Sequence, residues 1–227
     1  MRSTAKNLDI LFEDNHLIIV NKRTGDLVQG DKTGDAPLSD LLKAYIKEKY
    51  NKPGNVYLGV VHRLDRPTTG IVIFAKTSKA LERLNKMLRE KTIDKTYWAV
   101  VKNKPSQTEG TLINYLRKNP KNNKATVFNK ETNDTKKAIL HYKTLKTLDN
   151  YYLLEIDLET GRHHQIRAQL SNINCPIKGD LKYGFNRSNK DAGIHLHARK
   201  ISFIHPVLKE KLTIEAPTPK DPIWDAC

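Results

Sequence analysis

The stretch HRLDRPTTG (62–70) places the carboxylate of Asp65 between the guanidinium groups of Arg63 and Arg66, and apolar runs lie on both sides of it. In an extended chain, residues two apart share a face, so we expect Arg63 and Asp65 to point the same way while Leu64 enters the core. The closing PTTG is typical of a turn. Because a nearby guanidinium favours the ionised carboxylate, this pattern suits a nucleophile or an electrostatic stabiliser. A turn held by an ion pair explains the same spacing equally well.

A second polar constellation lies in GRHHQIRAQLS (161–171), which we predict to be a short helix. Around its apolar positions it carries more hydrogen-bonding side chains than a packing helix needs: Arg162, His163, His164, Gln165, Arg167 and Gln169. We expect no metal site, for two reasons. His163 and His164 are adjacent and should diverge on a helix, and His195 with His197 lack an acidic or cysteine partner at metal spacing.

Strand-like runs dominate the rest of the chain and must position these groups. They are HLIIV (16–20), IVIFA (71–75), TYWAVV (96–101), AILHY (138–142), YYLLEIDLE (151–159), HARKISFI (197–204) and KLTIEA (211–216). In the fifth run apolar and acidic residues alternate, which indicates a strand with one buried face. Two amphipathic helices are predicted, at 37–50 and at 78–90, the second with Ser78 as its N-cap. These elements predict an α+β fold with mostly antiparallel strands.

The composition indicates a globular protein with an anionic partner. Forty Lys and Arg against 25 Asp and Glu give a formal net charge of +15, which points to a polyanion such as nucleic acid. The chain has no apolar run long enough to span a bilayer and no export or transit signal, so we expect a cytoplasmic protein. Its two cysteines form no disulfide framework.

The length of 227 residues suits one domain, and we assign 1–227 to it. No repeat or flexible linker divides the chain. The segment 102–137 is rich in Asn, Lys and Thr, and we interpret it as a possible excursion of loops and short hairpins, either solvated or used as an RNA arm.

The motif HRLDRPTTG resembles the HRLDxxTSG motif of the RluA-type pseudouridine synthases, which isomerise uridine to pseudouridine in structured RNA. Four further stretches are similar to motifs of that family in the same order, so the resemblance spans nearly the whole chain. They are ILFEDNHLIIVNKRTG (10–25), DKTYWAVV (94–101), TGRHHQIRAQLSNINCPIKGDLKYG (160–184) and LHARKISFIHPVLKEKLTIEAPTP (196–219).

The chain departs from the family pattern at five positions, none of them a catalytic one. Arg23 stands where Pro is usual, Thr69 where Ser is common, His164 for Thr, Gln169 for His and Asn174 for Gly. We expect such departures to affect RNA contacts. Because the first motif begins near residue 10, we also expect this form to lack the N-terminal S4 RNA-binding domain that many relatives carry.

The resemblance implies a pseudouridine synthase fold, in which a mixed, mainly antiparallel sheet in two halves is flanked by helices and contains a central catalytic cleft. It implies that Asp65 is the catalytic carboxylate, acting at ribose C1′ through an acylal or a glycal intermediate. Arg167 aligns with the basic residue that pairs with this aspartate, and Tyr97 with the tyrosine that stacks on the detached uracil. Arg63 aligns with an arginine that helps to extrude the target nucleotide.

Further contacts to RNA are expected from the polar residues of the two motifs, with Arg66 either structural or bound to a phosphate. These residues are His62, Arg66, Arg162, His163 and Gln165. An isomerisation needs no redox change or group donor, so we expect no cofactor and no metal. We expect a monomer with structured RNA, rRNA or tRNA, as its partner and with no obligate protein partner.

Two rival functions remain at this point. A non-catalytic RNA-binding protein could retain the same fold, although the intact Asp65, Tyr97 and Arg167 argue against it. A hydrolytic nucleosidase could use the same aspartate, but it would release free uracil. The particular RNA and uridine do not follow from the residues, because recognition depends on RNA shape and on flipped bases.

Overall fold

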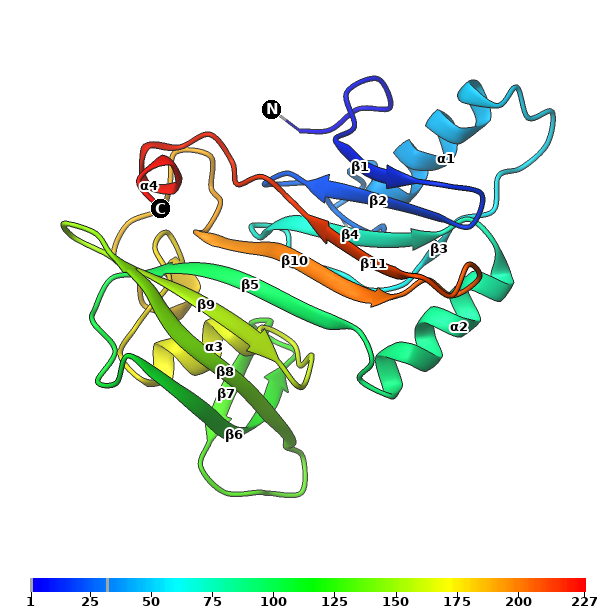
Figure 1. The fold of residues 1–227 in the computed structure, drawn as a ribbon. Helices are drawn as coiled ribbons and strands as arrows, with labels where there is room; N and C mark the ends of the chain where they lie inside the picture. The colour runs from blue at the N-terminus through cyan, green and yellow to red at the C-terminus, as the bar shows by residue number, and fades with distance from the viewer. Residues whose placement is uncertain (1, 32) are drawn as a thin grey trace. The chain divides into compact units, whose positions relative to one another are not determined.

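The computed structural model of the protein describes residues 2–31 and 33–227, which fall into two units (Figure 1). Unit 1 contains the residues up to Asp94 together with Ala198–Pro219, and unit 2 contains Lys95–His197 and Lys220–Cys227. The candidate carboxylate Asp65 therefore belongs to unit 1, whereas Tyr97 and Arg167 belong to unit 2. No helix in the described part of the chain is both long enough and apolar enough to cross a membrane.

The strands of unit 1 follow the order β1-β2-β4-β10, with β3 paired to β4 and β11 paired to β10. The pairings β1–β2, β2–β4, β3–β4 and β10–β11 are antiparallel. The strand bounds are β1 Ile10–Glu13, β2 Leu17–Lys22, β3 Gly59–Val60, β4 Thr69–Ala75, β10 Leu196–Ile204 and β11 Lys211–Glu215.

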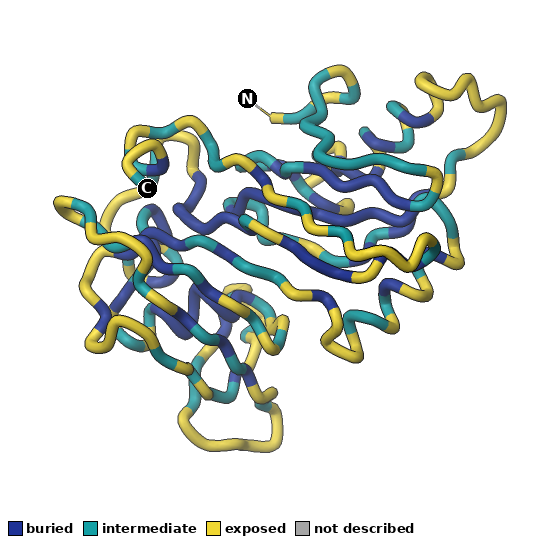
Figure 2. Tube along the Cα trace, viewed as in Figure 1, coloured by how far each residue is buried: buried dark blue, intermediate teal, exposed yellow. Residues whose placement is uncertain are grey.

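Strands β2 and β4 are buried on both faces and are dark blue almost throughout in Figure 2. A strand buried on both faces needs a continuous apolar run and not an alternating one, which is why LIIV and IVIFA form them. Helix α1 (Leu38–Lys49) contributes Leu38, Leu42 and Ile46 to the same apolar cluster as residues of these strands.

The N-cap of helix α2 (Ser78–Arg89) differs from the predicted Ser78. Thr77, not Ser78, caps the helix: its hydroxyl accepts a hydrogen bond from the Ala80 N–H at 3.2 Å, and its backbone is extended. Both residue types cap helices well, so the choice depends on where the chain leaves β4. The buried residues of α2 are Ala80 and Leu84, as its apolar stripe predicts.

The strands of unit 2 follow the order β5-β9-β8-β6-β7, and each of these neighbouring pairs is antiparallel. Their bounds are β5 Asp94–Val101, β6 Glu109–Asn119, β7 Lys124–Phe128, β8 Lys136–Thr147 and β9 Tyr152–Leu158. The segment 102–137, predicted as loops and short hairpins, thus contains the hairpin β6–β7.

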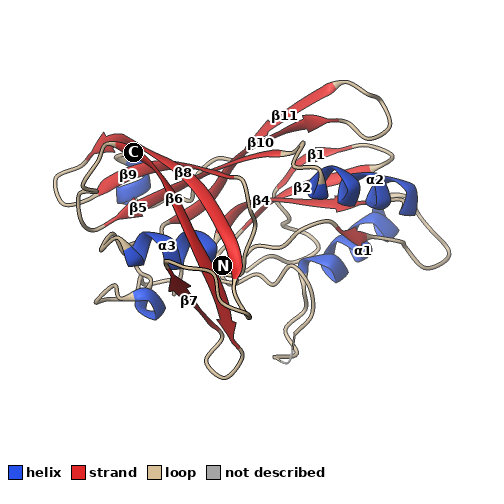
Figure 3. Cartoon of the chain, turned by 90° about the horizontal axis from the view of Figure 1, so that it is seen from below, coloured by secondary structure: helices blue, strands red, loops and turns tan. Residues whose placement is uncertain are grey.

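One face of this second group of strands is covered by helix α3 (Gln165–Asn172), which packs on β6 and β7 (Figure 3). Ala168 of α3 joins a buried cluster with Leu116, Ala125 and Ala138 from three strands and with Tyr183 from the 3-10 helix η1 (Leu181–Tyr183). The chain closes with α4 (Pro222–Asp225). Together the two units confirm the predicted α+β class with a mainly antiparallel sheet.

Candidate active site

Asp65 lies in the connection between β3 and β4, in unit 1. The backbone N–H of Thr68 donates to the Asp65 carbonyl oxygen at 3.0 Å, so a turn spans Asp65 to Thr68. The prediction had placed this turn at PTTG, two residues later; Thr69 and Gly70 instead belong to β4. As expected, Leu64 packs against the apolar core of unit 1. Asp65 is therefore the first residue of a tight turn.

Lys22, which was not among the residues predicted to be functional, holds this turn. The Lys22 ammonium donates to the carbonyl oxygens of Arg66 at 3.0 Å, Thr68 at 2.7 Å and Arg23 at 3.0 Å. The Arg66 carbonyl also accepts from the Gly25 N–H at 3.0 Å. The available sequence signal was a lysine two residues after the apolar run LIIV. In the structure Lys22 is only 1% exposed.

The position of Lys22 is electrostatically costly. Burial lowers its pKa from the ordinary 10.5 to about 7, while the negative charges of Asp26 and Asp65 oppose that shift. The three N–H groups of the ammonium match the three carbonyl acceptors. Lys22 therefore holds the turn through hydrogen bonds to its backbone, and the negative charge of Asp65 favours the charged form of Lys22.

Replacing Lys22 with methionine should remove about 3 kcal/mol of unfolding free energy, because three carbonyls lose their donor. In the wild type, the unfolded chain holds between pH 7 and 10.5 a proton that the folded chain has released, so its stability should rise across that window. Urea titrations at several pH values check both effects, with the exposed Lys79→Met as control. A constant difference between wild type and Lys22→Met at all pH values would contradict the lowered pKa.

The other polar residues of the motif make different contacts within unit 1. His62 accepts a hydrogen bond from the Ile73 N–H at 3.2 Å through Nε2, which ties its ring to β4. Arg66 forms an ion pair with Asp35, which also pairs with Arg2 at 2.9 Å. Arg63 is exposed. Of the two arginines that flank Asp65, Arg66 thus serves the loop structure, and Arg63 presents its guanidinium to solvent.

Gly70 allows another backbone to approach the end of the turn. Its φ is +110°, and a Cβ built there would lie 2.4 Å from the carbonyl oxygen of Ala198 in β10. No side chain fits at that distance, and the positive φ is strained for any other residue. Glycine is therefore required at this position, directly beside the Asp65 turn.

In unit 2, Tyr97 lies in β5 opposite Ile156 of β9, and its side chain is mostly buried. Arg167 lies in α3 and is 5% exposed. Its guanidinium forms a bidentate ion pair with Asp180, with Nε to Oδ2 at 2.7 Å and Nη2 to Oδ1 at 2.8 Å. The guanidinium also lies 5.1 Å from the centre of the Tyr183 ring.

Asp180 was missed as a functional candidate, although the quoted KGDLKYG contains it. Its side chain is buried, and its charge offsets that of Arg167. Since a bidentate carboxylate fixes the plane of a guanidinium, Asp180 orients Arg167 within unit 2. The pairing of Arg167 with Asp65 stays a prediction.

The expected helix at 161–171 begins four residues later, at Gln165. His164 adopts a left-handed conformation with φ 52°, which a continuous helix excludes. The Gln165 side chain holds the preceding turn: its Oε1 accepts from the Thr160 hydroxyl at 2.8 Å and from the Arg162 N–H at 3.0 Å. The turn is therefore built by side-chain hydrogen bonds that helical periodicity does not reveal.

This early turn also corrects the expectation for the histidine pair. The rings of His163 and His164 do not diverge but stack, with centroids 3.8 Å apart, because the pair precedes the helix. His164 Nδ1 lies 2.9 Å from the Tyr183 hydroxyl. His195, which has no acidic residue at metal spacing in the sequence, lies 3.0 Å from Asp221, which is 26 residues away.

Three of the departures from the family pattern have structural tasks. Gln169 is fully buried, and its amide donates to the Leu112 carbonyl at 3.1 Å and to Asn114 at 2.9 Å, which fastens α3 to β6. Asn174 has φ 58° and ends the turn after α3, a conformation that asparagine tolerates. Arg23 donates to the Asn7 carbonyl at 2.8 Å.

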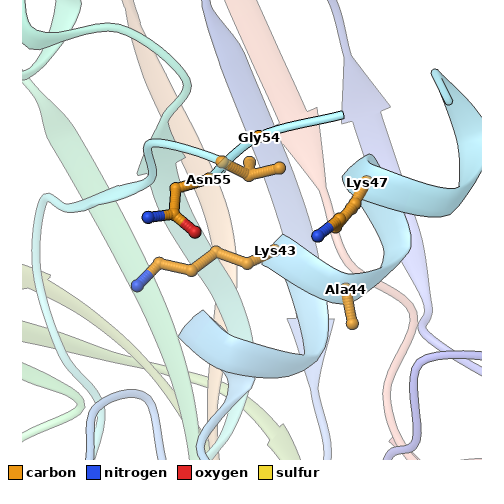
Figure 4. Close-up of a pocket in the computed structure, with 6 residues that line it drawn as sticks. Lys43, Ala44, Lys47, Gly54 and Asn55 are labelled. Atoms are coloured by element: carbon orange, nitrogen blue, oxygen red, sulfur yellow. The ribbon is translucent and has the colours of Figure 1, made fainter. Parts of the chain in front are cut away.

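A cavity of about 350 Å³ lies in unit 1, between α1 and the loop that follows it (Figure 4). Its lining residues are Lys43, Ala44, Lys47, Gly54, Asn55 and Val56. None of them is a predicted site residue, and the cavity is open to solvent. The candidate catalytic groups are therefore assigned from the motifs and their contacts and not from this cavity.

The chain is similar to a known protein family and to several of its members. A model of the family described as RNA pseudouridylate synthase matches residues 16–172. The chain is 37% identical over 216 residues to an uncharacterized RNA pseudouridine synthase of Synechocystis, covering 93% of this chain and 66% of the relative. It is 32% identical over 224 residues to the ribosomal large subunit pseudouridine synthase D of Zymomonas mobilis, covering 94% and 70%. The chain thus spans about two thirds of the length of these relatives.

Solved structures give the same result for the fold. The human protein RNA pseudouridylate synthase domain containing 4 aligns with a TM-score of 0.80 and 26% identity, over 95% of this chain and 91% of that chain. Human RNA pseudouridylate synthase domain containing 1 aligns with a TM-score of 0.78 over 100% and 90%, at 22% identity. The second similarity supports the fold alone.

Proposed function

Because the chain belongs to the RNA pseudouridylate synthase family, whose members are isomerases that act on RNA, we propose that it converts uridine to pseudouridine in structured RNA. The catalytic carboxylate in this proposal is Asp65. The observation that carries it is the family match over residues 16–172, which includes Asp65, Tyr97 and Arg167. The turn that holds Asp65, anchored by buried Lys22, supports a role that needs a fixed carboxylate.

The proposed reaction moves the uracil from one of its atoms to another. The N1–C1′ bond breaks while the Asp65 carboxylate acts at the ribose C1′ side, the base turns, and C5 bonds to C1′. The hydrogen on C5 leaves as a proton and N1 gains one, so atoms and charge balance with no oxidant, donor or cofactor. Tyr97 stacks on the detached ring, and its hydroxyl assists removal of the C5 proton.

The target nucleotide has to leave its stack before this chemistry, which costs a few kcal/mol. Arg63 is exposed, as a group that occupies the place of an extruded base must be. Exposed Arg162 and half-buried His163 provide further RNA contacts. Phosphate contacts of a chain with net charge +15 supply binding energy that decreases with salt.

His62, Arg66 and Gln165 act in this proposal mainly as positioning residues. His62 binds the backbone of β4, and Arg66 pairs with Asp35, so both shape the turn that carries Asp65. Gln165 is 3% exposed and shapes the turn before α3. We assign residues 1–227 to one catalytic domain that works as a monomer in the cytoplasm.

The RNA pool to test first is rRNA, because the Zymomonas relative is named for the large ribosomal subunit, with tRNA as the second pool. RNA labelled with tritium at uridine C5 is prepared from cells that lack the protein and is incubated with the purified enzyme. Release of tritium with no free uracil is the expected result. Free uracil on chromatography would instead indicate a nucleosidase, and no release from either pool would favour a non-catalytic RNA-binding protein.

A further inference from the structure

Strands β6, β7 and β8 carry aromatic and basic side chains on the face opposite α3. In the antiparallel register Tyr115 of β6 lies between Phe128 of β7 and Lys137 of β8, and the three side chains form one row across the strands. Residues two apart share a face, so Arg117 and Ile113 extend the row along β6 in both directions. We call these five residues the hairpin platform.

The two faces of β6 differ in what covers them. Leu116, on one face, is 4% exposed and packs with Ala168 of α3, and Asn114 binds Gln169 of the same helix. On the platform face Ile113 is 54% exposed, and Arg117 is also exposed. On this face the strand therefore presents an exposed apolar side chain next to aromatic and basic ones.

The aromatic part of the platform already holds a stacked cation. The Arg117 guanidinium lies 4.7 Å from the centre of the Phe128 ring. Tyr115 and Phe128 are both partly exposed, and they stand directly opposite each other on neighbouring strands. Two rings and a planar guanidinium side by side offer flat surfaces on which nucleobases stack.

The surrounding charge is strongly positive. The segment 109–147, which contains all three strands, has nine lysines and arginines against three acidic residues, a formal net charge of +6. Figure 2 shows the loop between β7 and β8 as exposed. A partner that combines apolar flat groups with negative charge fits this surface better than an apolar protein segment does.

The backbone at the edge of the platform contacts two residues that are proposed to bind RNA. Arg162 Nε donates to the Lys137 carbonyl at 2.9 Å, and His163 Nε2 lies 3.4 Å from the Asn123 carbonyl in the β6–β7 loop. Both contacts are to the backbone, since Arg162 and His163 precede α3, which packs on the other face of these strands. RNA on the platform therefore occupies the face of β6–β8 that α3 leaves uncovered.

We propose that the hairpin platform binds an unpaired segment of the RNA substrate, with bases stacked on Tyr115 and on the Arg117–Phe128 pair and phosphates near Lys137. The identity of the partner rests on the proposed function, but the platform contains none of the catalytic residues. It is an accessory docking surface for a single-stranded stretch of the RNA, on the face of β6–β8 opposite α3 and Arg167.

Fluorescence anisotropy of a fluorescein-labelled oligouridylate of about twelve nucleotides tests this surface directly. Tyr115→Ala combined with Phe128→Ala should weaken binding about tenfold, since each stacked base contributes substantially to single-strand affinity. Tyr57→Ala, which removes a 47% exposed tyrosine of unit 1, is the matched control and should have little effect. Arg117→Gln, a change at an exposed position, should weaken binding and reduce its salt dependence even if the double variant folds poorly.

Ultraviolet crosslinking of the same oligonucleotide followed by mass spectrometry should locate attachment at Tyr115 or Phe128. Unchanged affinity in both folded variants, or crosslinks confined to other segments, would overturn the platform and leave its face to a protein partner. The two proposals fail separately. With rRNA, platform variants should raise KM about tenfold and leave kcat unchanged, whereas an inactive wild type that still binds the oligonucleotide here would refute only the isomerase.

Discussion

Asp65→Asn is expected to lower tritium release from C5-labelled RNA by at least about a thousandfold, as removal of a catalytic nucleophile does. Asparagine has nearly the same shape but no charge, so it can neither attack C1′ nor stabilise positive charge that develops there. The turn itself should persist, because the Thr68 N–H binds the backbone carbonyl of Asp65 and not its side chain. Single-turnover assays with excess enzyme isolate this chemical step from product release.

The matched control for this variant is Asp40→Asn, which makes the same change on the surface of α1, where the side chain is 63% exposed. It should retain full activity. Binding of RNA by Asp65→Asn should stay within about twofold of wild type, because RNA affinity depends mainly on phosphate contacts. A loss of activity smaller than tenfold would show that Asp65 is not the catalytic carboxylate.

Asp180→Asn is expected to reduce the free energy of unfolding by about 3–5 kcal/mol, the usual effect of removing one partner of a buried ion pair. The Arg167 guanidinium is 5% exposed, so water cannot replace the lost carboxylate. Activity should fall as well, because Arg167 loses the bidentate contact that orients it. Equilibrium urea unfolding gives the first quantity and tritium release the second.

Two further variants make that result specific. Glu215→Gln removes a surface ion pair with Arg199, at 3.2 Å, and should cost less than about 1 kcal/mol. Arg167→Met combined with Asp180→Leu removes both buried charges and should restore most of the lost stability. This double variant should remain inactive; full activity would contradict the role of Arg167, and wild-type stability of Asp180→Asn would contradict the importance of the ion pair.

Local patterns in the sequence were sufficient to predict most of the elements. The apolar runs at 16–20 and 71–75 correspond to β2 and β4, and the helices predicted at 37–50 and 78–90 agree with α1 and α2 to within one residue at each end. Apolar residues recur with a period of two in half-buried strands and 3.6 in helices, so the sequence alone reveals these elements. The fold class follows from the same patterns, whereas the family was inferred from the resemblance of the ordered motifs to those of the RluA-type enzymes.

The errors occur where side chains, and not backbone periodicity, decide the local structure. Thr77 replaced Ser78 as cap, and the Asp65 turn closed two residues early because its carbonyls are held by Lys22. Helix α3 started late because the Gln165 amide bridges Thr160 and Arg162. Such side-chain hydrogen bonds compete with those of regular helices and strands. Which of the two forms depends on neighbours that are not adjacent in sequence.

The sequence by itself determined the elements and the motif around Asp65, because these depend on residues that are close together in the chain. It also determined the family, through the order of several motifs along nearly the whole chain. Only the tertiary structure decided which groups hold the motifs in place. Lys22 reaches the Thr68 carbonyl across 46 residues, and Arg167 forms its bidentate pair with Asp180, 13 residues away in sequence. With 40 cations and 25 anions, sequence offers many possible partners, and burial in a folded core selects among them.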